Sequence, residues 1–499
     1  MKIELGLKYS IEDLAPIIYD KESLELSEEV RVNVRKGRLF LEEKIARENR
    51  PYYGINTGFG ELCHVQVGPD ELETLQLNLI RSHACGVGPA VQEDVVRWML
   101  VLKILSLSKG LSGVREEILD GLLHLLNDHL IPEVPETGSL GASGDLAPLA
   151  HLCLPLIGEG VIHHGGERLE VADHRSTLKL EPITLMEKEG LALLNGTQYM
   201  AAMTAHLLHK GNRVVDIMLH IAACSCEAFE AHTEPLDPRI HEARGQLGQI
   251  EAAQRLRERR PLNPQRDLGL SHVQDPYSFR CMPQVFGATL DSMHQVNQVL
   301  EREINGVTDN PNIFPDSDAI LIGGNFHGQP LAFGLDHLKV AFSELASISE
   351  RRTFLLLSGK RDLPIFLTQN AGLESGLMIA QYTAAALVNR CKNLCLPASM
   401  DSIVSSNGQE DHVSMGANAG VETLQILDFV EDVLAIEMIC ASQALFLREK
   451  MQPSSSQAVL GLSSLCQAFL KNFRLQVQPN LEERILSTEI RQSRQTLFS

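Results

Sequence analysis

Long apolar faces at helical spacing dominate the pattern of hydrophobic and polar positions along the chain. Between residues 416 and 448, apolar side chains recur at steps of three, four and seven, which keeps one face of a helix apolar. Residues 198–231 and 333–358 repeat this spacing, and all three segments exceed an ordinary helix in length. One short neighbour cannot cover such faces. The pattern therefore predicts an all-α fold, a long and mostly antiparallel helix bundle whose faces are shared between subunits.

The first 195 residues show a more mixed pattern. Residues 159–171 alternate apolar and polar positions around a Gly-Gly pair, which predicts a β-hairpin. No repeat or low-complexity linker interrupts the chain, and the polar stretch 232–276 is interpreted as an excursion between helices. We therefore predict a single domain over residues 1–499, with a smaller mixed N-terminal part up to residue 195 and a long-helix bundle over 196–499.

Composition and charge exclude several classes of partner. Of the 499 residues, 44% are hydrophobic and 22% charged, which suits a globular protein with a large core. The formal net charge of -20 argues against binding to nucleic acid or to an anionic membrane. A local basic run is interpreted as a solvated helix face; it comprises Arg255, Arg257, Arg259 and Arg260. The most apolar helical segment, residues 95–110, is too short and too charged to span a bilayer.

The cysteines suit neither a zinc site nor a disulfide framework. Cys224-x-Cys226 and Cys391-x-x-x-Cys395 lie in helical patterns without a companion His or Cys at ligand spacing. We expect buried, reduced thiols, no metal, and a cytoplasmic protein whose N-terminus carries no signal peptide.

Residues 138–151, GSLGASGDLAPLAH, place small residues in front of an aspartate and an apolar run. By composition alone, this stretch is typical of a turn followed by a helix capped by Asp145. The alternative is a covalent rearrangement of the backbone. The amide nitrogen of Gly144 could attack the carbonyl carbon of Ala142, because glycine leaves that approach unobstructed. Loss of water from Ser143 would then leave a methylidene-imidazolone, an electron-poor alkene.

The stretch GASGDLAPLAH resembles the signature of the aromatic amino acid ammonia-lyase and aminomutase family. Six further segments resemble that family's motifs in the family's order: YGINTGFGE (53–61), RSHACGVG (81–88), GLALLNGTQ (190–198), VQDPYSFRCMPQVFGA (273–288), GGNFHGQP (323–330) and NGQEDHVSMG (407–416). The resemblance implies a methylidene-imidazolone formed autocatalytically from Ala142, Ser143 and Gly144, with no PLP and no metal. It also implies a homotetramer with shared active sites, in which Tyr53 and Ser143 of one site belong to different chains.

Within the family, QDPYSFRC and QEDHVSM look most like the members that act on histidine. The resemblance then implies removal of ammonia from L-histidine to give trans-urocanate, a step of histidine degradation. Tyr53 would be the general base, on a glycine-bearing loop that closes over the site; this use requires a lowered phenol pKa. Tyr52 beside it is an alternative. Without the motif, Tyr53 is more typical of a packed loop aromatic than of a catalytic base.

The resemblance assigns further residues around the substrate. Arg280 would clamp the carboxylate with its planar fork, and Tyr277 and Gln274 precede it on one segment that could present all three. Asn195 would donate to the imidazolone oxygen or hold the substrate, and Phe326 would wall the pocket. Without the motifs, Arg280 is typical of a structural ion pair, Asn195 of a helix cap and Phe326 of a core residue.

Three residues would select the substrate ring. His83 and Glu410 would flank the imidazole and exchange hydrogen bonds with its nitrogens, and Met378 would supply a soft contact. Glu410 discriminates best, because relatives acting on phenylalanine or tyrosine usually have glutamine there. Asn407-Gly408 and the segment GELCHVQV (60–67) instead resemble the tyrosine branch. A tyrosine ammonia-lyase or tyrosine 2,3-aminomutase with the same electrophile therefore stays an alternative, as does a non-catalytic helical scaffold.

Overall fold

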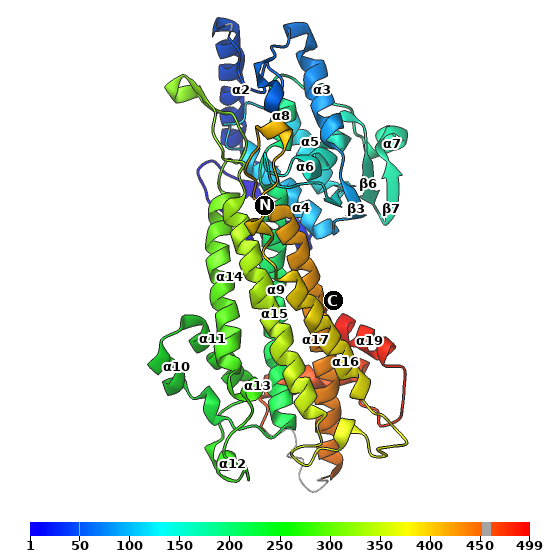
Figure 1. Cartoon of the computed structure of the whole chain (residues 1–499). Coiled ribbons are helices and arrows are strands. Elements are labelled where there is room, and N and C mark those ends of the chain that lie inside the picture. The colour runs from blue at the N-terminus through cyan, green and yellow to red at the C-terminus, as the bar shows by residue number, and fades with distance from the viewer. Residues whose placement is uncertain (49, 452–460) are drawn as a thin grey trace. The chain divides into compact units, whose positions relative to one another are not determined.

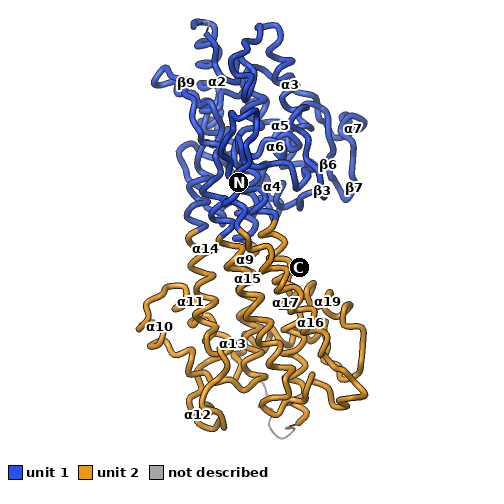
Figure 2. The backbone as a smooth tube through the Cα atoms, viewed as in Figure 1, with its two compact units in different colours: residues 1–209, 296–336, 397–421 blue, residues 210–295, 337–396, 422–499 orange. Residues whose placement is uncertain are grey.

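The computed structural model describes residues 1–48, 50–451 and 461–499, and most of these lie in helices (Figure 1). This confirms the prediction of an all-α fold with a few short strands. Two compact units can be distinguished (Figure 2): unit 1 holds residues 1–209, 296–336 and 397–421, and unit 2 holds residues 210–295, 337–396 and 422–499. Four long helices contribute residues to both units: α9 (Gln198–Ala228), α14 (Met282–Ile304), α15 (Gln329–Leu356) and α17 (Gly416–Met451). The assignment of the whole chain to one domain stays a prediction.

Unit 1 contains the mixed part of the chain. Its helices are α1 (Ile11–Tyr19), α2 (Glu28–Glu48), α3 (Leu72–His83), α4 (Glu93–Leu107), α5 (Glu116–Asn127), α6 (Leu146–Cys153), α7 (Val171–Leu178) and α8 (Glu189–Leu194). Its strands are β1 (Lys2–Ile3), β2 (Glu25–Leu26), β3 (Val87–Ala90), β4 (Ile131–Pro132), β5 (Pro135–Thr137), β6 (Val161–His164), β7 (Glu167–Glu170), β8 (Asn312–Phe314) and β9 (Ala319–Leu321).

The predicted hairpin and the apolar segment 95–110 both have clear structural outcomes. Strands β6 and β7 pair antiparallel from Val161↔Glu170 to His164↔Glu167, and Gly165 and Gly166 turn between them at φ of +59° and +85°. The apolar segment forms α4, every residue of which is buried from Val95 onward. Apolar residues lie on every side of this helix because it lies inside the core of unit 1, where its Arg97 and Lys103 are buried as well. In the described part of the chain, no helix has the length and apolar character needed to cross a membrane.

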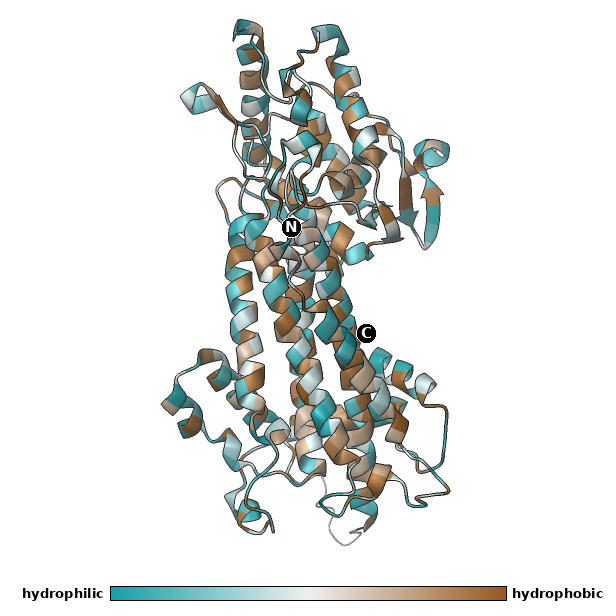
Figure 3. Ribbon diagram, viewed as in Figure 1, coloured by the Kyte–Doolittle hydropathy of each residue, from teal (hydrophilic) through white to brown (hydrophobic). Residues whose placement is uncertain are grey.

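Unit 2 contains the remaining helices: α10 (Pro238–Arg244), α11 (Leu247–Arg259), α12 (Pro264–Leu268), α13 (Tyr277–Arg280), α16 (Met378–Leu394), α18 (Ser464–Gln476) and α19 (Leu486–Phe498). Apolar and polar positions are interspersed along each long helix rather than separated into blocks (Figure 3). Some of the polar positions face the core. Glu437 of α17 is fully buried and accepts two hydrogen bonds from Arg352 of α15, at 2.6 and 2.8 Å. Ser225 of α9 and Ser349 of α15 donate to the same carboxylate, so one charge pair joins three helices.

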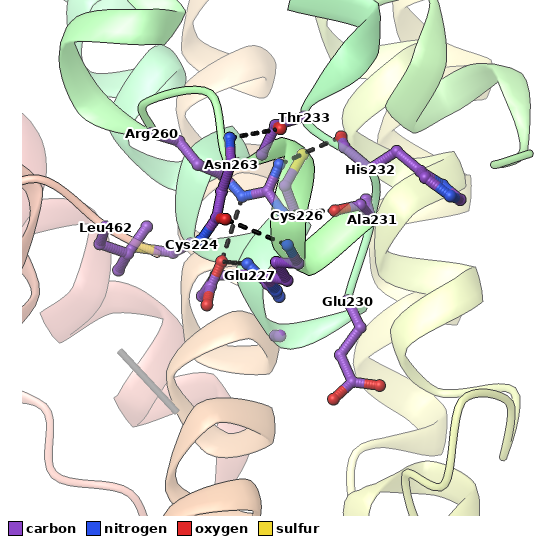
Figure 4. Close-up of polar contacts among 12 residues, drawn as sticks. Cys224, Cys226, Glu227, Glu230, Ala231, His232, Thr233, Arg260, Asn263 and Leu462 are labelled. Atoms are coloured by element: carbon purple, nitrogen blue, oxygen red, sulfur yellow. Dashed lines mark hydrogen bonds and ion pairs between the residues drawn. The ribbon is translucent and has the colours of Figure 1, made fainter. Parts of the chain in front are cut away.

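The basic run at the end of α11 is not a solvated helix face, so that interpretation is wrong. Arg259 and Arg260 are buried, and Arg260 donates through Nε to the buried Glu227 at 3.1 Å (Figure 4). Its other nitrogens donate to the carbonyl oxygens of Ala231 and His232. The guanidinium therefore donates hydrogen bonds to backbone carbonyl groups just after the end of α9. The local sequence shows the arginine charges, but it does not show that a buried carboxylate 33 residues earlier pairs with Arg260.

Candidate active site

A cavity of about 550 Å³ in unit 1 brings together three of the seven predicted catalytic residues and one predicted substrate-binding residue. Its lining includes Tyr53, His83, Ser143 and Glu410, together with residues of the Gly58–Leu62 loop and of α3 and α8. All of these belong to the same chain. The prediction that Tyr53 and Ser143 of one site come from different chains is therefore wrong for this cavity. The loop carrying Tyr53 folds back onto the segment that carries Ser143 within one subunit.

Backbone geometry around the tripeptide demands glycine at residue 144. Its φ is +73°, and an added Cβ would lie 2.0 Å from the carbonyl oxygen of Gly196. The next amide, that of Asp145, donates to this same oxygen at 2.7 Å. Glycine at residue 144 is therefore a steric requirement for the close approach of two backbone segments.

Asn195 connects the end of α8 to the tripeptide. Its Nδ2 donates to the carbonyl oxygen of Ser143 at 2.7 Å and lies 2.9 Å from the Ser143 hydroxyl. Its Oδ1 is buried without a hydrogen-bond partner among the described residues. The side chain thus points at Ser143, as the resemblance implied, and makes no hydrogen bond that caps a helix. Beneath it, the buried Lys103 donates to the Asn195 carbonyl at 2.9 Å, and burial lowers the pKa of that lysine to about 8.

Asp145 does not cap the helix that follows it, so the simple turn-and-cap interpretation is wrong. Its carboxylate makes no hydrogen bond at the start of α6. It instead accepts from the amides of Tyr199 and Met200 at 3.1 and 3.0 Å, at the beginning of α9. Ser139 donates to it as well. Burial raises the pKa of Asp145 to about 7 despite these donors. Sequence reasoning could not find these partners, because they lie more than 50 residues away.

Tyr53 lines the cavity, but its phenol pKa differs from the expectation. Its hydroxyl accepts from the amide of Gly60 at 3.4 Å, and its ring lies edge-on to Phe59. Burial raises the pKa of Tyr53, the Gly60 donor opposes this, and the charge of Glu410 raises it further. The expectation of a lowered pKa is therefore wrong for this structure. The neighbouring Tyr52 donates to Glu48 and is absent from the cavity lining.

His83 and Glu410 offer acceptors to the cavity. His83 Nδ1 lies 2.8 Å from the carbonyl oxygen of Leu79, which can only accept, so Nδ1 carries the proton and Nε2 stays an acceptor. Burial lowers the pKa of His83, which favours this neutral form. Glu410 Oε2 accepts from the hydroxyls of Ser405 and Ser406 at 2.8 and 2.9 Å. Sequence reasoning did not single out either serine.

The other predicted residues lie outside this cavity lining. Phe326 belongs to unit 1, and Met378 begins α16 in unit 2. Gln274, Tyr277 and Arg280 form one cluster in unit 2, in which Arg280 donates to Gln274 and its guanidinium lies 4.7 Å from the Tyr277 ring centre. The structure confirms that one short segment presents these three side chains together. Tyr277 is 68% exposed.

Among the described residues, one cluster has the composition of a metal site. Ligand atoms of His232, His272 and Asp275 lie within 4.8 Å of one another in unit 2. Arg361 donates to Asp275 Oδ1 at 3.1 Å and contacts the His272 ring, so a guanidinium already supplies the positive charge. We interpret the cluster as an ion network that holds the start of the 272–280 segment, since a divalent cation would have to displace Arg361.

Comparison with known proteins identifies relatives along the whole chain. A family model described as aromatic amino acid lyase matches residues 9–474. The histidine ammonia-lyase of Geobacillus thermodenitrificans is 47% identical over 464 residues, covering 92% of this chain and 91% of that protein. The histidine ammonia-lyase of Bacillus subtilis is 46% identical over 450 residues, with coverages of 89% and 87%.

Solved structures agree with these matches. The histidine ammonia-lyase of Trypanosoma cruzi has a TM-score of 0.89 at 37% identity, covering 100% of this chain and 93% of that one. The phenylalanine aminomutase of Pantoea agglomerans has a TM-score of 0.93 at 30% identity, covering 100% and 99%. These findings confirm the family resemblance read from the motifs.

Proposed function

Because the chain belongs to the aromatic amino acid lyase family, we propose that it is an ammonia-lyase that converts L-histidine into trans-urocanate and ammonia. The observation that carries this substrate is Glu410, a carboxylate in the same cavity as Ser143. An imidazole ring carries an N–H that a carboxylate accepts, and a phenyl ring has no such donor. The relatives named histidine ammonia-lyase, at 43–48% identity, support the same substrate.

The residues around Ser143 fit a methylidene-imidazolone. Ring closure between Gly144 N and the carbonyl carbon of Ala142 would leave the Ser143 carbonyl oxygen as the imidazolone oxygen, and Asn195 already donates to that oxygen at 2.7 Å. The close approach of Gly196 holds Gly144 in its positive-φ conformation. Once formed, this group would supply an uncharged electrophile that draws electrons from the bound amino acid.

The remaining side chains have separate tasks in the proposed reaction. Tyr53 Oη, as the phenolate, would accept the β-proton and become a neutral phenol, and the Gly60 amide would stabilise the phenolate charge before this transfer. Glu410 would accept the single ring N–H of a neutral imidazole, and His83 would flank the ring. The Gly58–Leu62 loop lines the cavity and would exclude water when it closes over the substrate. Arg280, with Gln274 and Tyr277, would bind the carboxylate through its two parallel N–H groups.

We also propose a homotetramer with shared active sites, and a cytoplasmic location for it. Support for sharing comes from the placement of residues: Tyr53 and Ser143 line one cavity, whereas Tyr277 is largely exposed and belongs to unit 2. A second chain would then supply the Arg280 cluster. Inactive Tyr53→Phe and Arg280→Ala chains should regain activity when they are refolded together. Failure to regain any activity would exclude sharing between these two residues.

A tyrosine lyase or tyrosine 2,3-aminomutase is the second candidate. One observation favours it: Asn407, which resembles the tyrosine branch, lines the cavity. The deciding experiment measures urocanate from histidine against coumarate and β-tyrosine from tyrosine, using the same purified protein. A higher kcat/KM for tyrosine than for histidine would overturn the proposed substrate.

A further inference from the structure

Two serine hydroxyls hold one oxygen of Glu410 from both sides. Ser405 donates to Glu410 Oε2 at 2.8 Å, and Ser406 donates to the same atom at 2.9 Å. Neither bond uses Oε1. A carboxylate oxygen that accepts two hydroxyl groups is fixed in one orientation, so the second oxygen keeps a defined direction as an acceptor.

The backbone brings the three side chains together. Ser405 and Glu410 form an antiparallel bridge, in which the Ser405 amide donates to the Glu410 carbonyl at 3.0 Å. Ser406 and Asn407 have φ of +48° and +54°, conformations that non-glycine residues adopt rarely. The turn between residues 405 and 410 is therefore shaped to return Ser405 and Ser406 toward the Glu410 carboxylate.

The carboxylate also stands between two cavities of unit 1. Ser406 lines the 550 Å³ cavity with Tyr53, and Ser405 lines a smaller cavity of about 190 Å³ with Ala142 and Gly144. Glu410 lines both. Each cavity therefore contains one of the two serines that donate to the Glu410 carboxylate.

Ser406 also lies close to the Tyr53 loop. A Cβ placed on Gly60 would be 3.5 Å from the Ser406 hydroxyl, so the space between the loop backbone and this hydroxyl would be filled by one methyl group. The amide of Gly60 is also the donor to Tyr53. A substitution of Ser406 would therefore affect both the Glu410 carboxylate and the loop that carries Tyr53.

We propose that Ser405 and Ser406 are positioning residues that determine specificity for the imidazole ring, by orienting Glu410 so that Oε1 accepts the ring N–H. This inference rests on the proposed function. The pair does not touch the reacting atoms and acts through Glu410. Its effect must therefore disappear when Glu410 can no longer accept from the substrate.

The test compares the two serine substitutions in two backgrounds. Ser405→Ala together with Ser406→Ala should lower kcat/KM for L-histidine about tenfold, mainly through KM, since one charge-assisted hydrogen bond loses its alignment. In a Glu410→Ala background, where no side-chain acceptor remains to be oriented, the same two substitutions should change kcat/KM by less than about twofold. Calorimetric affinities for urocanate supply the same comparison where turnover is slow. The single variant Ser405→Thr should keep wild-type kinetics, because threonine retains the hydroxyl. The extended backbone of residue 405 (φ −135°) accepts a β-branched side chain.

Ser399→Ala, a hydroxyl lost from the same segment away from Glu410, is the matched control and should match the wild type. Equal losses in both backgrounds would assign the serines a structural role only and overturn the inference, as would no loss in either. A wild-type protein that forms no urocanate would overturn the proposed function and the inference with it. An active wild type with unaffected serine variants would overturn the inference alone.

Discussion

Glu410→Gln separates charge from shape at the residue that carries the substrate assignment. Glutamine has nearly the same volume, and its single side-chain oxygen is needed by the hydroxyls of Ser405 and Ser406. The amide NH₂ would then face the substrate ring in place of Oε1. A hydrogen bond to a charged group, worth about 1.5–3 kcal/mol, would be lost, and two donors would face each other at a further cost of about 1 kcal/mol or more. Together these give roughly 2.5–4 kcal/mol, or about 10²–10³-fold in kcat/KM for histidine.

The assay for this prediction is spectrophotometric release of urocanate, with thermal unfolding measured in parallel. The melting temperature should stay close to that of the wild type, because both serine bonds are retained. Glu73→Gln, at an exposed position of α3, is the matched control and should leave the rate unchanged. A loss of less than about threefold for Glu410→Gln would refute the role of the carboxylate in holding the ring.

Three further predictions concern the base, the tripeptide and the core. Because the pKa of Tyr53 is raised, the phenol is mostly protonated at neutral pH and its phenolate fraction grows as the pH rises. The kcat/KM should therefore rise about tenfold per pH unit from neutral into the alkaline range. A flat pH profile would contradict Tyr53 as the base. Gly144→Ala should block ring formation, so that the chain keeps the mass of two water molecules and loses activity, because the added Cβ would meet the Gly196 oxygen. Intact-mass measurement checks this, and a dehydrated, active variant would contradict it. Glu437→Gln should destabilise the protein by about 3–5 kcal/mol, because it leaves Arg352 buried without a charge partner. The double variant Arg352→Met/Glu437→Leu should recover most of this loss, and denaturant unfolding compares the two. Equal losses of stability in both variants would contradict the pairing.

Local periodicity was sufficient to predict the long helices. The pattern over 416–448 corresponds to α17 (Gly416–Met451), and that over 333–358 to α15 (Gln329–Leu356). The β6–β7 hairpin was predicted because its turn chemistry is contained in adjacent residues. These features depend on neighbours in sequence, which a single chain displays directly.

Features that depend on distant partners could not be predicted in this way. Asp145 was interpreted as a helix cap, and its partners on α9 became visible only in three dimensions. Arg260 was assigned to a solvated face, although the buried Glu227 neutralises it. Burial likewise decides the direction of the Tyr53 pKa, and burial is a property of the fold. The assignment of site residues to catalytic roles came from motif resemblance and stays a prediction.

The most direct measurement of the central claim is the mass of the tryptic or chymotryptic fragment that contains residues 138–151, taken from freshly purified, active protein. Ring closure at Ala142, Ser143 and Gly144 predicts a fragment lighter than its sequence by two water molecules, and a Ser143→Ala fragment without the second loss. An active wild-type protein whose fragment has the full mass of the unmodified peptide would contradict the account.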